Sequence, residues 1–148
     1  MPSENDQWLP LGEIQISALG QLETSVRLET CSPWFSGHFE ECPVVPGVAL
    51  LAFVGETVRR QCERQGRSVE VSGFFKVRFR RAAFPEESLL VSVAPMPSGP
   101  KADLPFHVTC DGDSVAQGTL KVTEIRARGP FLGKADERTA ERAKDKNC

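Results

Sequence analysis

Polar and apolar residues alternate near the start of the chain, and this alternation predicts two strands. In residues 13–17 and again in residues 24–28, every second side chain is apolar, which is typical of a strand with one buried face. After a long connection the pattern changes at Val48, where an uninterrupted apolar run begins. Charged residues follow that run, so we predict a helix from Val48 to about Arg64, buried over its first turns and exposed over its last.

Period-two patterns return after this helix, which Gly66 is expected to end. The predicted strands cover residues 69–71, 74–79, 89–93, 106–110 and 114–123. In one of them, Phe75, Val77 and Phe79 are expected on one face, with Lys76, Arg78 and Arg80 on the other. Asp111-Gly112 predicts a tight hairpin turn, and residues 95–105, rich in proline and glycine, are predicted to form a loop.

The order of these elements predicts an α+β fold. A single helix this apolar must be covered, and a curved antiparallel sheet is the largest element available to cover it. The length of 148 residues fits one domain, which we place at residues 1–125. Residues 126–148 are mostly charged, so we expect a solvated, flexible tail.

Composition excludes several classes of function. The net charge of −2 and the pI near 5.7 show no basic excess of the kind that nucleic acid attracts. The sequence has no apolar run long enough for a membrane span and no secretory signal at its start, so a cytoplasmic location is expected. Five cysteines lack the spacing of a metal site or a disulfide framework, so reduced thiols are expected.

The connection before the helix carries the candidate chemistry. His38 lies in it, and Pro46-Gly47 turns the chain into the helix. The free N–H groups and the positive dipole end of a helix at this point are suited to stabilise a developing negative charge. A histidine beside an oxyanion site is a workable catalytic arrangement, although a lone histidine is commonly only structural.

The motif around this histidine resembles a known family. Gly37-His38-Phe39, Pro43 and Pro46-Gly47-Val48 match, at the same spacing, a motif of the FabA/FabZ-type 3-hydroxyacyl-[acyl-carrier-protein] dehydratases of the hotdog fold. Residues 74–81 and the turn at residues 84–87 are also similar. The resemblance covers roughly residues 10–125 and implies a sheet wrapped around the central helix and a dimer with sites at the subunit boundary. It implies no cofactor or metal.

The resemblance also implies roles for particular residues. His38 would act on the α-proton of a 3-hydroxyacyl thioester, and the Gly47 N–H would bind the thioester oxygen. The acid that the family carries on the helix aligns with Ala52, which cannot transfer a proton. Glu56, one turn further along the same helix face, is the candidate substitute. We expect burial to raise its pKa and favour the protonated form, whereas the alternative is an ordinary ion pair with Arg59 or Arg60.

Substrate contacts are also predicted, as part of an acyl site. Phe39 and Val48 are predicted to contact the substrate. Phe53 and Phe75, together with Phe74 and Phe84, are expected to line an acyl tunnel, although phenylalanines near a helix and a sheet more often belong to the core. The basic residues of the strand after the helix are either a solvated face or a dock for an acidic carrier protein. They are Lys76, Arg78, Arg80 and Arg81.

Four functions are compatible with this pattern. The first is a dehydratase of fatty-acid or polyketide type metabolism that acts on thioesters of acyl carrier protein or coenzyme A and is active as a homodimer. The second is one subunit of a mixed hotdog dimer whose partner supplies the acid missing at Ala52. The third is a non-catalytic acyl-thioester binding subunit, and the fourth is a thioesterase.

Overall fold

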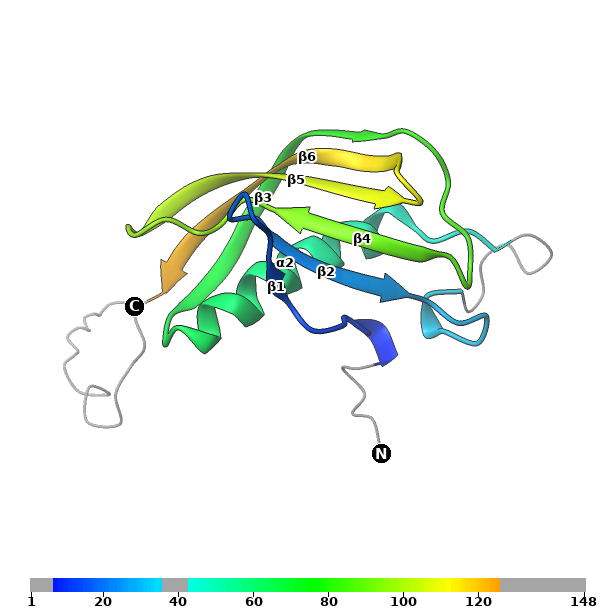
Figure 1. The fold of residues 1–148 in the computed structure, drawn as a ribbon, viewed down its shortest axis with the longest axis horizontal. Coiled ribbons are helices and arrows are strands. Elements are labelled where there is room, and N and C mark those ends of the chain that lie inside the picture. Colours follow the sequence, from blue (N-terminus) through cyan, green and yellow to red (C-terminus); the bar gives the residue numbers. More distant parts are fainter. Residues whose placement is uncertain (1–6, 36–42, 126–148) are drawn as a thin grey trace, which may run out of the picture.

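The computed structural model describes residues 7–35 and 43–125, in which one six-stranded antiparallel sheet curves over one long helix (Figure 1). The elements in chain order are β1 (Gln15–Ile16), β2 (Leu22–Arg27), the 3-10 helix η1 (Pro33–Phe35), α2 (Gly47–Arg64), β3 (Ser68–Phe79), β4 (Ser88–Val93), β5 (Lys101–Cys110) and β6 (Asp113–Ile125). Across the sheet their order is β1-β2-β4-β5-β6-β3. The predicted α+β arrangement is confirmed, while the predicted tail lies outside the described residues.

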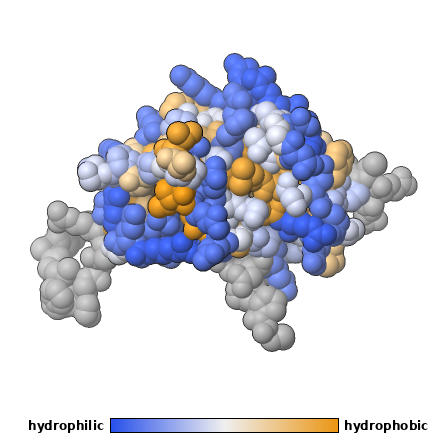
Figure 2. Space-filling model, viewed as in Figure 1, coloured by the Kyte–Doolittle hydropathy of each residue, from blue (hydrophilic) through white to orange (hydrophobic). Residues whose placement is uncertain are grey.

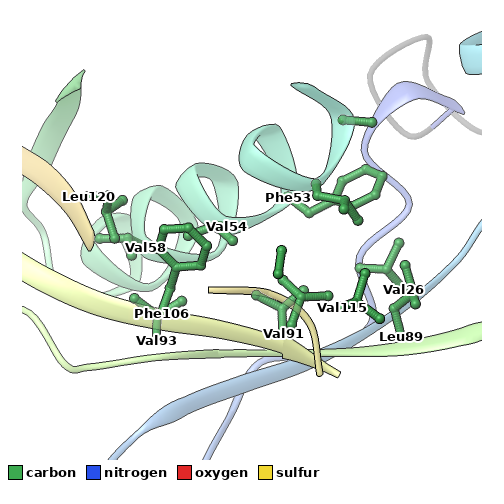
Figure 3. Packing of buried hydrophobic residues seen from close by; sticks show 14 of the residues in the cluster. Val26, Phe53, Val54, Val58, Leu89, Val91, Val93, Phe106, Val115 and Leu120 are labelled. Carbon is green, nitrogen blue, oxygen red and sulfur yellow. The ribbon is translucent and has the colours of Figure 1, made fainter. Parts of the chain in front are cut away.

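The core forms between α2 and the concave face of the sheet. Phe53, Val54 and Val58 of the helix are fully buried against the sheet, where Val91 and Val115 are equally buried (Figure 3). At the other end of the helix, Gly66 has a positive φ of 77° and donates its N–H to the carbonyl of Glu63. Such a left-handed residue ends a helix, so the predicted stop at Gly66 is confirmed.

The turn between β5 and β6 confirms one prediction, and the start of β5 corrects another. Asp111 and Gly112 both have positive φ angles, 51° and 86°, as the type I′ hairpin requires. The predicted loop at 95–105 is shorter than expected, because β5 begins at Lys101 and includes Pro105. The Pro105 carbonyl accepts from Ala94, just beyond the end of β4, so the missing proline N–H falls where the ladder to β4 has already ended.

The face prediction for β3 is wrong at Phe75. Phe74 packs edge-on against Phe106 in the core, with ring centroids 6.0 Å apart, whereas Phe75 lies on the outer face under the Lys121 ammonium group. A β-bulge then breaks the register between Phe75 and Arg78, with Lys76 at a φ of 57°. Because the bulge inserts an extra residue, Val77 returns to the core side, and the alternation expected from the sequence fails.

The segment before α2 is held by an aromatic cluster. The indole Nε1 of Trp34, in η1, donates to the carbonyl of Trp8 at 2.6 Å, and the two rings lie edge to face with centroids 4.8 Å apart. Trp34 also contacts the buried Phe53 ring, with a centroid distance of 6.4 Å. This cluster therefore fixes η1 against the N-terminal segment and the helix.

The surface seen in the view of Figure 1 is mainly hydrophilic, with separate small hydrophobic patches (Figure 2). Within residues 7–35 and 43–125, no helix is long and apolar enough to cross a membrane.

Candidate functional site

The N-terminus of α2 opens into a pocket of about 390 Å³. Pro46 caps the helix without a side-chain hydrogen bond, and the N–H groups of Gly47 and Val48 donate to no described residue. Phe79 of β3 lies directly against Gly47, since a Cβ added there would come within 2.8 Å of the ring. The pocket therefore lies at the start of a helix whose first N–H groups have no acceptor among the described residues and suit an anionic oxygen, and it has an aromatic wall.

The turn after β3 anchors this helix start. The Val45 N–H donates to the carbonyl of Ala83 at 2.7 Å, which ties the last residues before α2 to the turn. Glu87 in turn accepts hydrogen bonds from both Nη atoms of Arg81 and from the Phe84 N–H. The Arg81 hydrogen bonds, followed by that of Phe84, lower the pKa of Glu87, so it stays ionised and holds the turn in place.

Glu86 links the same turn to the segment after β2. Its φ is 71°, an uncommon angle for a residue with a side chain. Its carboxylate pairs with Arg27 and accepts the Thr30 N–H at 3.1 Å. The turn thereby contacts both the segment that precedes η1 and the segment that enters α2.

A second pocket, of about 480 Å³, runs along α2 beside Ala52. Most of its lining is apolar, and three of the lining residues are charged. The lining residues are Leu9, Leu51, Ala52, Gly55, Glu56, Arg59, Val69, Glu70, Val71 and Phe74. Its volume lies in the range of small-molecule sites. We call it the Ala52 groove.

Glu56 in this groove is an ion-paired carboxylate. Its side chain is only 7% exposed and accepts from Arg59 Nη2 at 2.5 Å and from Arg60 Nε at 2.7 Å. Burial by itself raises the pKa of Glu56, but the hydrogen bonds and charges of the two arginines outweigh burial and lower it. The expectation of a raised pKa and a protonated donor is therefore wrong, because two guanidinium groups, rather than apolar neighbours, surround the carboxylate.

The predicted site residues fall into separate places. Gly47 and Val48 lie at the helix start, where Val48 is 64% exposed. Phe53 is completely buried in the core, and Phe75 lies on the outer face of the sheet. His38 and Phe39 lie outside the described residues. No pocket described here brings Phe53 or Phe75 beside Gly47.

Sequence reasoning missed two features of this site. It did not foresee the contact between Phe79 and Gly47, although Phe79 belongs to the stretch that carries the resemblance. It also missed the pairing of Arg81 with Glu87. Their spacing of six residues matches no helical or strand periodicity, so no sequence signal indicated that pair.

A curved antiparallel sheet around one buried helix, with a pocket at the start of that helix, defines a hotdog-fold protein. Solved hotdog structures superimpose on the chain. The dehydratase heterocomplex ApeI:P from Xenorhabdus doucetiae contains a chain with a TM-score of 0.63 and 23% identity, covering 76% of this chain and 96% of that one. The E. coli PaaI protein from the phenylacetic acid degradation operon gives a TM-score of 0.61 at 15% identity, covering 80% and 86%. A hypothetical thioesterase from Streptococcus pneumoniae TIGR4, with coenzyme A, gives 0.58 at 11% identity, covering 79% and 90%.

The chain belongs to the ApeI-like dehydratase family, whose model matches residues 15–119. Among characterised relatives, the 3-hydroxyacyl-[acyl-carrier-protein] dehydratase FabZ of Streptococcus sanguinis (strain SK36) is 28% identical over 120 residues, covering 78% of this chain and 81% of that enzyme. FabZ of Streptococcus pneumoniae serotype 4 is 30% identical over 93 residues, covering 60% and 66%. The resemblance to dehydratases and the hotdog fold predicted from the sequence are both confirmed.

Proposed function

We propose that the chain works as a dehydratase-type enzyme that removes water from 3-hydroxyacyl thioesters to give 2-enoyl thioesters. The observation that carries this proposal is the helix start, where Gly47, whose N–H donates to no described residue, lines a pocket together with Phe79. His38 removes the α-proton, and the Gly47 N–H stabilises the negative charge that develops on the thioester oxygen. The C–O bond to the 3-hydroxyl then breaks, and the leaving hydroxide takes a proton to become water.

The source of that last proton is the open step. Ala52 has no proton to give, and Glu56, predicted as the substitute, is ionised by its two arginines. Loss of a general acid costs roughly 10²–10⁴-fold in rate. The lowered pKa therefore weighs against Glu56 as the acid and favours a weak enzyme when this chain acts alone.

A mixed dimer is the second candidate function, and Ala52 favours it. The Ala52 groove is open along the helix beside β3. β3 is the longer of the two edge strands of the sheet, and no described strand pairs with its outer side. Long free edges readily pair with another chain. We propose that this edge forms a dimer, with a second copy or with a related hotdog chain whose own helix carries the missing carboxylate.

The substrate arrives as a thioester of acyl carrier protein or coenzyme A. Lys76, Arg78 and Arg80 of the β3 region are exposed and make no ion pair with a described residue. They offer an acidic carrier a positive surface. Arg81 does not belong to this surface, because Glu87 neutralises it.

The test is turnover of a 3-hydroxyacyl thioester, and hydration of its enoyl product, by the purified chain and by the variants His38→Ala, Glu56→Gln and Ala52→Glu. We expect weak activity in the wild type. His38→Ala should abolish it, Glu56→Gln should change it by less than about threefold, and Ala52→Glu should increase it by roughly 10²-fold. A large loss in Glu56→Gln would show that Glu56 is the acid after all. If neither the wild type nor Ala52→Glu is active but both still bind an acyl thioester, the remaining function is that of a non-catalytic acyl-thioester binding subunit.

A further inference from the structure

The outer face of the sheet carries a trough that takes no part in the proposed bond-breaking steps, although Lys76 and Arg78 in it also belong to the positive surface proposed for the carrier. It has a volume of about 870 Å³ and follows β6, which lies between β5 and β3. Gln117 and Thr119 of β6 line its middle, Lys76 and Arg78 line it from β3, and His107 lines it from β5. Strand register sets this arrangement, because Arg78, Gln117 and His107 are direct cross-strand neighbours.

Two of the side chains that line this trough, Lys76 and Arg78, only donate hydrogen bonds, while His107, Gln117 and Thr119 can both donate and accept. No carboxylate occurs among its described lining residues, which are Lys76, Val77, Arg78, Pro105, Phe106, His107, Gln117, Gly118 and Thr119. Neither Lys76 nor Arg78 forms an ion pair with a described residue. By contrast, five arginines elsewhere are paired with glutamates: Arg27, Arg59, Arg60, Arg67 and Arg81. Two uncompensated cations beside an amide and a hydroxyl form an environment suited to an oxyanion.

The backbone at Lys76 supports a binding role. Its φ of 57° is unfavourable for a side chain of this kind, and glycine would adopt it without strain. The bulge that imposes this angle also places both Lys76 and Arg78 at the same trough. Strain of this type concentrates where a side chain has a functional task.

We infer that this trough binds the phosphate group of an organic phosphate or inorganic phosphate itself. Arg78 and Lys76 supply the charge, and Gln117 and Thr119 supply neutral donors to the remaining oxygens. The whole chain has a net charge of −2, so a general attraction of anions by an excess of positive charge would not explain such binding. If the proposed function holds, a natural source is the phosphate on the pantetheine arm that carries the acyl thioester; this last step rests on that function, whereas phosphate binding does not.

The experiment is a titration of the isotopically labelled chain with inorganic phosphate, with coenzyme A and with pantetheine, which lacks phosphate, followed by amide NMR shifts. We expect phosphate and coenzyme A to shift amides of β3, β5 and β6 around the trough, and pantetheine to leave them unchanged. Tighter binding of coenzyme A than of phosphate would identify an organic phosphate as the ligand, and equal binding would identify the free ion.

Two variants and one control make the assignment specific. Lys76→Gly relieves the backbone strain while removing the charge, so it should fold, and Arg78→Gln keeps a polar side chain. Each should weaken phosphate binding by roughly tenfold, while Lys101→Gln, an exposed lysine of β5 that does not line the trough, should not. Equal loss in all three variants, or shifts away from the trough, would overturn the site. Phosphate binding that persists in a chain without turnover would leave the site standing and remove only its link to the substrate.

Discussion

Two guanidinium groups contact one buried carboxylate at Glu56, and this contact decides what that residue can do. A carboxylate paired with Arg59 and Arg60 accepts hydrogen bonds but has no proton to donate. Arg60 also reaches the carbonyl of Leu9, so the cluster joins α2 to the N-terminal segment. At this scale Glu56 acts first as a stabilising residue.

Replacing Glu56 by glutamine should therefore reduce stability in a pH-dependent manner. At pH 7 we expect a loss of about 1–2 kcal/mol in the free energy of unfolding, because a buried charge pair is broken beside partly exposed partners. The folded pKa of Glu56 lies below its ordinary value of 4.5, so its contribution is present above that value and is lost as the pH falls through the folded pKa. Urea unfolding between pH 7 and pH 3 should show the two curves converge.

The matched control is Glu63→Gln, which removes a 55% exposed carboxylate whose one ion pair among the described residues is with Arg59. Its loss should be below about 0.5 kcal/mol at pH 7. If Glu56→Gln were no more destabilising than this control, the stabilising role assigned to Glu56 would be wrong.

Gly47→Ala should separate activity from folding. The new Cβ would meet the Phe79 ring at 2.8 Å, but that ring is 53% exposed and free to move. We expect stability within about 1 kcal/mol of wild type and a fall of roughly 10–100-fold in kcat/KM, because the wall beside the oxyanion site is displaced. Adding Phe79→Ala removes the clash. If Gly47→Ala lowers activity as much in the Phe79→Ala background as it does in the wild type, displacement of the ring is not the cause.

At the scale of elements, close packing of three strands depends on Gly118. A Cβ there would lie 3.0 Å from both the Phe106 ring and the Val77 backbone. Since backbone moves with difficulty, Gly118→Ala should cost about 1–3 kcal/mol in thermal or urea unfolding. Gly73→Ala on β3 is the control, because a Cβ added at Gly73 would meet no atom within 4 Å, and it should change stability far less. Equal effects in both would mean that the bulge is not packed against β6 in this way.

The elements that local chemistry determines were predictable from the sequence. The helix follows from its apolar run, and the β5–β6 turn follows from Asp111-Gly112. The outward position of Phe75 was not predictable, because a bulge arises from the fit of two strands rather than from residues in one. The sign of the pKa change at Glu56 likewise depends on both arginines adopting the paired rotamer, which helix spacing permits but does not require.

At the scale of the whole molecule, the proposed site should be shared between subunits. We predict that the wild-type chain, with His38 but no acid, complements the double variant His38→Ala/Ala52→Glu, which has the acid but no histidine. Refolding the two together should produce mixed dimers, each with one complete site, and about one quarter of the activity of Ala52→Glu homodimers. The measurement is enoyl-thioester hydration after mixing.

The controls are each chain refolded alone, together with sedimentation of all species to establish that dimers form. If mixed dimers form and activity does not exceed the sum of the separate chains, the histidine and the acid act within one subunit. A monomer in sedimentation at micromolar concentration would instead remove the proposed pairing along β3.

The aromatic cluster at Trp8 and Trp34 makes the protein its own optical probe. The chain has two tryptophans and no tyrosine, so its tryptophan emission originates from this one edge-to-face pair of indoles. Because Trp34 immediately precedes the connection that carries His38 in the sequence, emission recorded during a ligand titration reports on that neighbourhood without any attached dye. Unfolding of the core around Phe53 would change the same signal, so tryptophan emission can follow both ligand binding and the unfolding of the protein.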